Sequence, residues 1–333
     1  MMRKLRTGIP AAVGLLILIL DTKTALVGAS RGLELCLRTV IPSLLPFFVL
    51  SILLTSATVG ENIPFLRPLG RLLGIAKGTE SLLLVGMLGG YPAGAQCVAQ
   101  AYRDGAVSKR NAQQMLAFCN LAGPAFLFGI IAGKFTASST VWALWGIHLL
   151  SAFLVALLLP GRSSAAAVLT PGKPMTLADA LQRSLRIMAG VCGWIILFRV
   201  IITFLELWLL WLLPVPVQVA ITGFLELSNG CCDLQRINNE GLRFVLCSAM
   251  LAFGGMCVCM QTASVTDGLN LKQYYIGKVL QTLLCVLLSS ILAAKSVGFP
   301  VLLWIVLLIV IAVTVKFLHK KQKRCSISPL VGV

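Results

Sequence analysis

Gly86-Met-Leu-Gly-Gly-Tyr-Pro-Ala-Gly-Ala95 interrupts an apolar run with glycine and proline, and Phe118-Cys-Asn-Leu-Ala-Gly-Pro-Ala-Phe-Leu-Phe-Gly129 interrupts the next one. The second half of the chain has counterparts in Gly223-Phe-Leu-Glu-Leu-Ser-Asn-Gly230 and Ala252-Phe-Gly-Gly-Met-Cys-Val-Cys-Met-Gln261. Backbone in hydrocarbon must satisfy its own hydrogen bonds, so a broken helix persists only where it lines a polar cavity or is buried in protein. Paired interruptions in two halves therefore predict the binding site of a secondary transporter with internal repeats.

The composition is that of a membrane protein. Hydrophobic residues make up 58% of the chain and charged residues only 12%, and the mean hydropathy is +0.94. Several runs approach the roughly 20 apolar residues that span a bilayer. The net charge is +17, but Lys and Arg that flank apolar spans act as topology signals. Because the basic loops hold few aromatic residues, we expect no nucleic-acid partner.

Metal, cofactor and enzyme chemistry have little support in the sequence. The chain has eleven cysteines, most of them in apolar runs, where cysteine behaves as a small hydrophobe. His148 and His319 lie far apart, and no C-x-x-C occurs, so a zinc site is not expected. A P-loop and an H-E-x-x-H motif are also absent from the sequence. We expect no enzymatic activity, no metal and no cofactor.

The N-terminus has two interpretations. Arg3, Lys4 and Arg6 precede the apolar run 9–20, and Val27-Gly-Ala29 resembles a small-residue cleavage site. A signal peptide is one interpretation. A retained first span is the one we favour, because the rest of the chain is itself embedded in the membrane. Both place the N-terminus in the cytoplasm.

Ten apolar segments set the topology. They are 9–28, 39–58, 80–101, 111–133, 139–160, 187–213, 216–232, 242–266, 274–294 and 298–318. If all ten cross, the basic loops 102–110 and 161–186 both fall outside, against the positive-inside tendency. If 80–101 and 216–232 are re-entrant hairpins, the loops 59–79, 102–110, 161–186 and 267–273 and the basic C-terminal tail all become cytoplasmic. We therefore expect an all-α polytopic membrane protein with about eight spans and two re-entrant hairpins.

The two halves then match as an inverted repeat. The predicted regions are an N-terminal span and loop (1–38), a first membrane repeat (39–160), a cytoplasmic linker (161–186), a second, inverted repeat (187–294), and a C-terminal span with a basic tail (295–333). The linker contains turn-rich stretches, typical of a connection between halves. Thr176 followed by Asp179 is expected to cap the helix that enters the second half.

Charge inside a span is costly and usually faces the bundle interior. Arg199 lies near the middle of 187–213, and Glu206 follows at about 10 Å along the helix axis, which is long for a direct pair. Glu226 lies in the second hairpin. We expect Arg199 to meet either an anionic substrate or Glu226. The alternative is a structural ion pair that holds the hairpin to the bundle.

The interruptions supply the other candidate residues. The tip of the first hairpin offers a tight turn and free carbonyl groups to a substrate or ion, although a kinked helix packed through small residues would explain the same residues. Asn120 and Gln261 occupy matching places in the two repeats, where each would hydrogen-bond either a substrate or a neighbouring helix. The predicted substrate-binding residues are Gly90, Tyr91, Pro92, Gly94, Gln96, Asn120, Gly123, Pro124, Arg199, Glu226, Asn229, Gly254, Gly255 and Gln261.

At these motifs the chain resembles the YlbJ-type sporulation integral membrane proteins, part of the wider nucleoside-recognition or Gate-domain group. Five stretches carry the resemblance, in the family's order: 41–51, 90–95, 118–124, 223–230 and 253–261. The resemblance implies a multi-pass protein of endospore-forming bacteria, similar to SpoVV-like transporters that move dipicolinic acid from the mother cell towards the forespore. Its location would be the mother-cell or outer forespore membrane.

The chain departs from the family pattern in places. A polar residue is expected after Asn120, where this chain has Leu121, and a polar residue or histidine near 259, where it has Cys259. The chain is also somewhat short for the family. These departures bear on the substrate rather than on the fold.

The sequence leaves several functions open. The first is a secondary transporter of a small anionic metabolite, with dipicolinic acid as the leading substrate. The others are a nucleoside or other metabolite transporter and a non-transporting scaffold of the sporulation machinery; an intramembrane enzyme is the remote option. The expected partners are the anion, the lipid bilayer, and either a second copy of the chain or other sporulation membrane proteins.

Overall fold

The computed structural model describes residues 2–58, 61, 63–159 and 175–293, and every regular element in this part of the chain is helical. The predicted all-α class is therefore confirmed for the described residues. The predicted span at 298–318, the basic tail and the linker stretch 160–174 lie outside them.

The elements follow one another along the chain as α-helices and short 3-10 or π segments (η). The first half contains α1 (Met2–Leu20), α2 (Thr22–Leu35), η1 (Cys36–Val40), α3 (Ile41–Thr58), η2 (Pro64–Leu66), α4 (Arg67–Leu73), α5 (Ser81–Leu88), α6 (Ala93–Arg103), α7 (Lys109–Leu116), α8 (Pro124–Phe126), η3 (Leu127–Ile131), η4 (Ala132–Lys134) and α9 (Ser138–Leu158). The second half contains α10 (Leu177–Trp208), η5 (Leu210–Leu212), α11 (Val215–Leu225), α12 (Leu227–Asp233), η6 (Leu234–Arg236), α13 (Glu240–Phe253), α14 (Gly255–Val265) and α15 (Lys272–Ala293).

Five helical stretches of the described residues are long and apolar enough to cross a bilayer. They are Thr22–Thr58, Ser138–Leu158, Leu177–Trp208, Glu240–Val265 and Lys272–Ala293. Five predicted spans each fall largely within one of these stretches: 39–58, 139–160, 187–213, 242–266 and 274–294. The predicted span 111–133 is instead divided into α7, α8 and η3. The segments predicted as hairpins contain only the short pairs α5–α6 and α11–α12. Their position relative to a membrane stays a prediction.

The N-terminal region differs from the prediction. We expected one span at 9–28 followed by a loop, but the first helix ends at Leu20, and Asp21 caps a second helix by accepting a hydrogen bond from the backbone N–H of Thr24 at 3.0 Å. The helix that starts at Thr22 then continues without a loop through η1 and α3 to Thr58. The pattern of apolar runs missed this continuity because Arg31, Glu34 and Arg38 resemble the charges of a loop.

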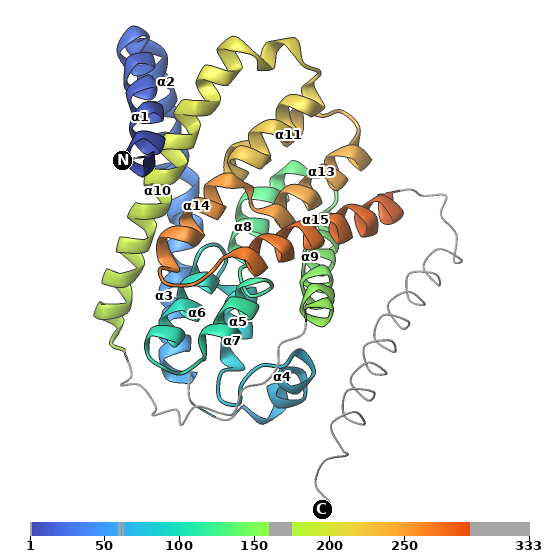
Figure 1. Cartoon of the computed structure of the whole chain (residues 1–333). Coiled ribbons are helices and arrows are strands. Elements are labelled where there is room, and N and C mark those ends of the chain that lie inside the picture. Colours follow the sequence, from blue (N-terminus) through green and yellow to red (C-terminus); the bar gives the residue numbers. More distant parts are fainter. Residues whose placement is uncertain (1, 59–60, 62, 160–174, 294–333) are drawn as a thin grey trace, which may run out of the picture.

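Helix α2 packs closely on α10, which lies beside it in Figure 1. A Cβ at Gly28 would lie 2.9 Å from the Val200 Cα, and a Cβ at Gly32 would lie 2.9 Å from the Ile196 Cα. Glycines four residues apart allow such close approach in membrane helices. The letters Gly28-Ala-Ser-Arg-Gly32 also match the hydrolase motif G-x-S-x-G. They lie inside a continuous helix, however, and not at the strand-to-helix turn that the motif requires.

Each half then folds into a short helical hairpin. In the first, α5 and α6 lie against each other, and a Cβ at Gly94 would lie 3.1 Å from the Gly86 Cα. In the second, α11 and α12 meet in the same way at Gly223 and Gly230, where an added Cβ would overlap the facing glycine. In each hairpin, one glycine of the pair lies on the helix before the turn and the other on the helix after it. The interruptions at 86–95 and 223–230 are therefore the tips of two helical hairpins.

Each hairpin is followed by a broken helix and then by a long helix. In the first half these are α7–α8 and α9, and in the second half α13–α14 and α15. The breaks are stabilised by different residues: Pro124 begins α8, whereas Gly254 ends α13 in the left-handed conformation with φ +83°. The elements thus follow the same order in both halves, and the bounds and inverted orientation of the two repeats stay a prediction.

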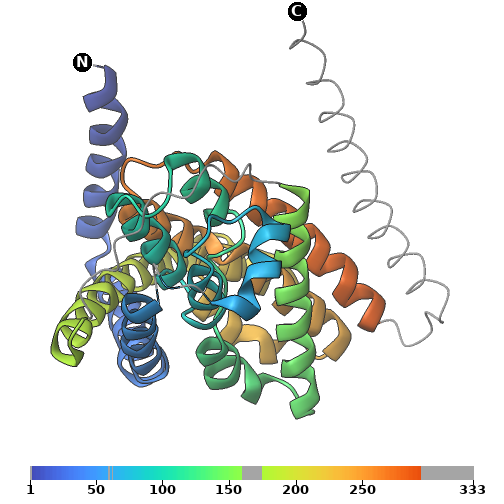
Figure 2. The same ribbon diagram turned by 90° about the horizontal axis from the view of Figure 1, so that it is seen from below.

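The loops gather at two ends of the molecule. At the end we call the arginine end, Arg183 donates to the Gln100 Oε1 at 3.1 Å, and Arg103 donates to the Val265 carbonyl at 3.4 Å. At the opposite end Arg243 donates to the Lys134 carbonyl at 2.8 Å. Figure 1 shows α4 and the start of α10 at the lower, arginine end; in Figure 2, seen from below, the short helices of the first half lie between green α9 and yellow-green α10. The loop after α6, the start of α10 and the end of α14 thus share one end, whereas the re-entrant topology itself stays a prediction.

Candidate functional site

The tips of the hairpins and the helix breaks meet near the centre of the molecule. At the first tip Gly90 adopts φ +76°, and a Cβ added to Gly123 would lie 2.9 Å from the Gly90 Cα. At the second tip a Cβ added to Gly255 would lie 3.2 Å from both the Gly223 carbonyl oxygen and the Leu227 nitrogen. Each tip therefore presses its backbone against the break that follows it, as only glycine permits.

Tyr91 joins the first tip to the second break. Its hydroxyl donates to the Leu251 carbonyl at 2.8 Å, and a Cβ at Gly254 would lie 3.3 Å from its Cζ atom. The side chain is 8% exposed. The predicted site residues Tyr91 and Gly254 therefore lie together although they come from different halves.

Lys278, on α15, is the buried cation at this junction, and the sequence analysis did not single it out. Its ammonium donates to the Asn120 carbonyl at 2.6 Å, the Tyr91 hydroxyl at 2.9 Å and the Ala252 carbonyl at 3.3 Å. It also lies 4.5 Å from the centroid of the Tyr91 ring. The side chain is 1% exposed, and among the described residues no carboxylate lies within ion-pair distance of it. One cation thus binds the tip of one hairpin and both helix breaks.

The signal for Lys278 was present in the sequence. A charge within a span marks a functional position, and Lys278 lies inside the predicted span 274–294. It lies only a few residues from the start of that span, however, where a basic residue is usually interpreted as a flanking topology signal.

Asn120 is fully buried and uses its side chain to tie the halves together. Its Nδ2 donates to the Thr262 hydroxyl on α14 at 2.9 Å, and its Oδ1 accepts from the Ala95 N–H on α6 at 3.4 Å. The predicted alternatives were a substrate contact and a contact with a neighbouring helix. The structure places Asn120 in the second arrangement, with its carbonyl on Lys278.

His148, on α9, satisfies the other side of the first break. Its Nε2 accepts from the Ala122 N–H at 3.1 Å, which places the ring proton on Nδ1. Gln281 on α15 lies beside it, with its Nε2 3.3 Å from the His148 carbonyl. The sequence analysis considered His148 only as a metal ligand and so missed this role.

Glu226 caps α12 and does not pair with Arg199. Its carboxylate accepts from the Ser228 N–H at 3.0 Å, the Asn229 N–H at 2.7 Å and the Asn229 Nδ2 at 2.6 Å. The side chain is 2% exposed. Negative charge is stabilised at a helix N-terminus by free N–H groups and by the helix dipole. This accounts for a buried carboxylate that has no cationic partner among the described residues.

Arg199 instead pairs with Glu206. Two hydrogen bonds, of 3.0 and 3.2 Å, join the guanidinium to the carboxylate, and Arg31 of α2 lies 3.7 Å from the same carboxylate. The expectation that Glu206 lies too far along the helix was wrong, because both long side chains extend towards each other. The Glu206 carboxylate therefore links α10 to α2, and Arg199 does not reach the second hairpin.

The remaining predicted residues surround the junction. Pro124 begins α8 and Gly94 presses on the Cys119 carbonyl oxygen. Pro92 immediately precedes α6 and follows a cis Tyr91–Pro92 peptide bond. Gln261 is buried and donates to the Cys257 Sγ at 3.2 Å. Gln96 has a buried Oε1 atom without a hydrogen-bond partner among the described residues.

A small cavity lies between the two tips. Its volume is about 30 Å3, and its lining includes Gly90, Tyr91, Gly123, Glu226 and Gln261. This leaves room for only about one to three water molecules. In this structure the space between the two hairpin tips is therefore closed to a metabolite.

A larger polar cavity, which we call the arginine cavity, lies nearer the arginine end. Its volume is about 510 Å3 and its lining includes Gln96, Arg103, Asp179, Arg183 and Arg186. Small-molecule sites commonly have volumes of roughly 300–1,000 Å3. Three guanidinium groups against a single carboxylate make this cavity suited to an anion.

The two cavities follow one another along the seam between α10 and α14. Ile187 and Val265 line the arginine cavity, and Val191 and Gln261, four residues away on each helix, line the central one. Four residues correspond to about 6 Å along a helix. The seam thus leads from the arginines to the tips.

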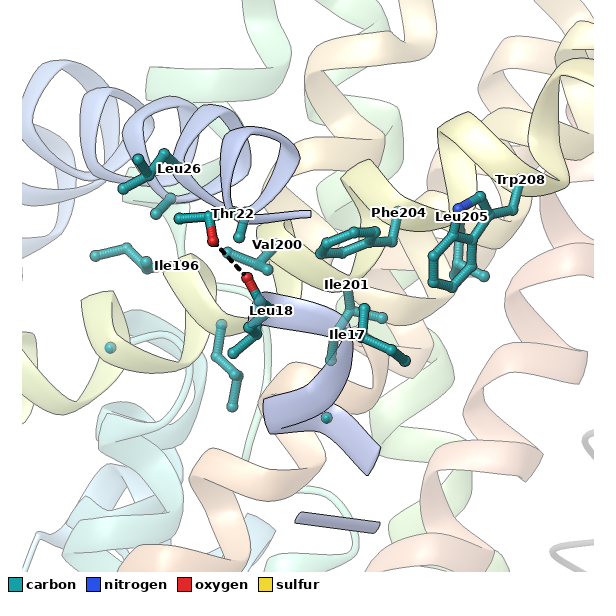
Figure 3. A pocket seen from close by; sticks show the side chains of 15 residues that line it. Ile17, Leu18, Thr22, Leu26, Ile196, Val200, Ile201, Phe204, Leu205 and Trp208 are labelled. Atoms are coloured by element: carbon teal, nitrogen blue, oxygen red, sulfur yellow. Dashed lines mark hydrogen bonds between the residues drawn. The ribbon is translucent and has the colours of Figure 1, made fainter. Parts of the chain in front are cut away.

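A third cavity, of about 680 Å3, lies between α1, α2 and α10, away from the junction of the hairpin tips and helix breaks. Figure 3 shows its apolar lining, with Leu26 and Ile196 on one side and Phe204, Leu205 and Trp208 on the other, and Thr22 bonded to the Leu18 carbonyl at 2.9 Å. Among the side chains that the structure describes, no charged one lines it. Its chemistry suits apolar chains rather than a small anion.

The chain is similar to the sporulation integral membrane protein YlbJ of Bacillus subtilis (strain 168), with 28% identity over 304 aligned residues. The match covers 76% of this chain and 74% of the relative. The resemblance to the YlbJ-type family is thereby confirmed. No family model matches the chain, and no solved structure matches it. The YlbJ similarity and the long apolar helices support an integral membrane protein of sporulation.

Proposed function

We propose that the protein is a secondary-type membrane transporter of a small anionic metabolite, with dipicolinic acid during endospore formation as its substrate. The observation that carries the proposal is the seam on which the arginine cavity and the central cavity follow one another beside two broken helices. In secondary transporters, substrates bind at such discontinuous helices near the interface of the two repeats.

Dipicolinate suits the arginine cavity by its chemistry. It is a dianion on an aromatic ring, and guanidinium groups bind carboxylates through paired hydrogen bonds. Arg183 is half-buried and Arg103 is exposed, and both donate to the same Gln100 oxygen. A carboxylate of the substrate would replace this neutral acceptor with a charged one. Gln96, whose carboxamide makes no bond to the described residues, offers a further polar contact deeper on the seam.

Passage beyond the arginine cavity requires the tips to separate. A cavity of about 30 Å3 admits no metabolite. The bonds that hold the first tip in place are those of Tyr91 to Leu251 and to Lys278. We expect their rearrangement to open the central cavity to one end of the molecule at a time.

A nucleoside is the second substrate class, from the wider group that the sequence resembles. An uncharged nucleoside does not require three arginines, so the cavity favours an anion. A non-transporting scaffold would contain the same helices but would carry no metabolite across the membrane.

The test is uptake of labelled dipicolinate into vesicles that carry the purified full chain. Replacing Arg183 or Arg186 by Gln should raise KM about fivefold, which corresponds to about 1 kcal/mol for a partly exposed charge. Arg110→Gln is the matched control, since Arg110 is exposed at the same end and makes no bond or ion pair with the described residues. Its KM should equal that of the natural protein.

The outcomes separate the alternatives. Saturable flux that excess nucleoside does not inhibit supports an anion carrier. Nucleoside uptake in its place assigns the other substrate class. Correctly inserted protein without flux of either compound leaves the scaffold.

A further inference from the structure

We propose that the Lys278 ammonium is a tethered substitute for a free monovalent cation. It occupies a cradle of carbonyl and hydroxyl oxygens built by both broken helices, so the natural protein takes no sodium ion at this position. Shortening the side chain to alanine should convert the cradle into a site for a free cation. The consequence for transport rests on the proposed function, but the binding property of the cradle does not.

The cradle has the composition of a cation site. Its oxygens are the Asn120 carbonyl, the Ala252 carbonyl and the Tyr91 hydroxyl, at 2.6, 3.3 and 2.9 Å from the nitrogen. An ammonium group has three donors, and each has one of these acceptors. The Tyr91 and Tyr274 ring centroids lie 4.5 and 5.9 Å from the nitrogen, within the range of cation–π attraction.

Both carbonyls are left free by the way the helices break. In a continuous helix the Asn120 carbonyl would accept from the N–H of residue 124, but that residue is Pro124, which has none. The Ala252 carbonyl lies at the end of α13, where the chain turns away through Gly254 and Gly255, both with φ +83°. Free carbonyls at helix C-termini carry partial negative charge. A cation stabilises both at once.

The same groups bind ions in other carriers. In secondary transporters, unwound backbone carbonyls and the C-terminal ends of half-helices coordinate the coupling cation. Here the cation is covalently part of α15. It therefore cannot leave with a gradient, and it holds the first tip and the two breaks together in the absence of any bound ion.

The experiment uses the full chain with Lys278→Ala. This change removes a propylammonium-sized group and leaves the three oxygens facing the space. Thermal unfolding is measured in detergent with n-propylammonium, sodium or choline chloride at equal ionic strength. We expect Lys278→Ala to unfold at a lower temperature than the natural protein in choline. Its midpoint should rise with propylammonium, and to a smaller extent with sodium, by several degrees in proportion to the logarithm of the concentration.

Lys278→Met is the matched control, because it fills the same space with an uncharged chain. It should show no difference among the three salts, and neither should the natural protein. Lys278→Ala that responds equally to propylammonium and choline would overturn the proposal. If Lys278→Ala does not fold, the natural protein still decides: selective stabilisation by sodium over choline would show that the cradle is not filled by Lys278.

Flux measurements separate this inference from the proposed function. Natural protein should transport at the same rate when choline replaces sodium. Restored stability of Lys278→Ala in propylammonium, with no flux of any tested compound in the natural protein, would keep the cradle and reject the transporter. Flux that requires sodium in the natural protein would reject the cradle and keep the transporter.

Discussion

Replacing Glu226 tests whether the second hairpin depends on its internal cap. Glu226→Ala removes the acceptor of three hydrogen bonds, from the Ser228 N–H and from both nitrogens of Asn229. Loss of an N-cap costs about 0.5–2 kcal/mol, and an unsatisfied buried amide costs roughly 1–3 kcal/mol. The two losses together amount to about 1.5–5 kcal/mol. Because burial of the carboxylate itself is unfavourable, we expect a net loss in the lower half of this summed range, about 2–3 kcal/mol.

The measurement is thermal unfolding of the purified full chain. For a chain of 333 residues, a loss of this size corresponds to a fall in Tm of roughly 3–4 °C. Glu226→Gln keeps one oxygen acceptor but turns an NH2 group towards the Asn229 donors, so we expect about half that fall. Glu34→Ala is the control, since Glu34 is exposed and its pair with Arg38 lies on the surface. A Glu226→Ala protein that unfolds within about 1 °C of the natural one would refute the capping role.

Three other changes follow from the same contacts. Gly94→Ala should prevent closure of the first hairpin, because the new Cβ overlaps the Cys119 carbonyl oxygen; Gly133→Ala, at a glycine with open space, should leave the yield of folded protein unchanged. Tyr91→Phe removes one acceptor from Lys278 and the donor to Leu251, and should lower stability by about 1–3 kcal/mol; a Tm equal to that of the natural protein would contradict the bridging role. If the arginine cavity attracts the substrate by charge, raising the salt concentration from about 0.05 to 0.5 M should raise KM severalfold, whereas an unchanged KM would argue for a neutral substrate.

The sequence predicted the interruptions well and the partners of the charged residues poorly. Glycine and proline inside apolar runs are local signals, and all four predicted interruptions are tips or breaks. The cap at Thr176, which accepts from the Asp179 N–H, was also a local prediction and is confirmed. Lys278 could not be paired from sequence, because its acceptors Tyr91 and Asn120 lie 187 and 158 residues away.

The error over Arg199 has a different origin. The rise per residue gives the distance between two backbone positions, but the side chains of Arg and Glu together span most of the 10 Å between positions seven residues apart. The continuous helix from Thr22 to Thr58 was missed because its charges were taken for a loop. Side-chain length decided the first outcome, and the packing of α2 against α10 decided the second.

The length of that helix has a consequence for the membrane around it. Thirty-seven residues correspond to about 55 Å at 1.5 Å per residue, against a hydrocarbon thickness of about 30 Å. A helix of this length must tilt steeply or emerge into the headgroups. Since Gly28 and Gly32 fix α2 against α10, the two helices must adapt as one unit. The thickness of the host bilayer therefore sets the inclination of α10, the helix that also forms one wall of the seam between the two cavities.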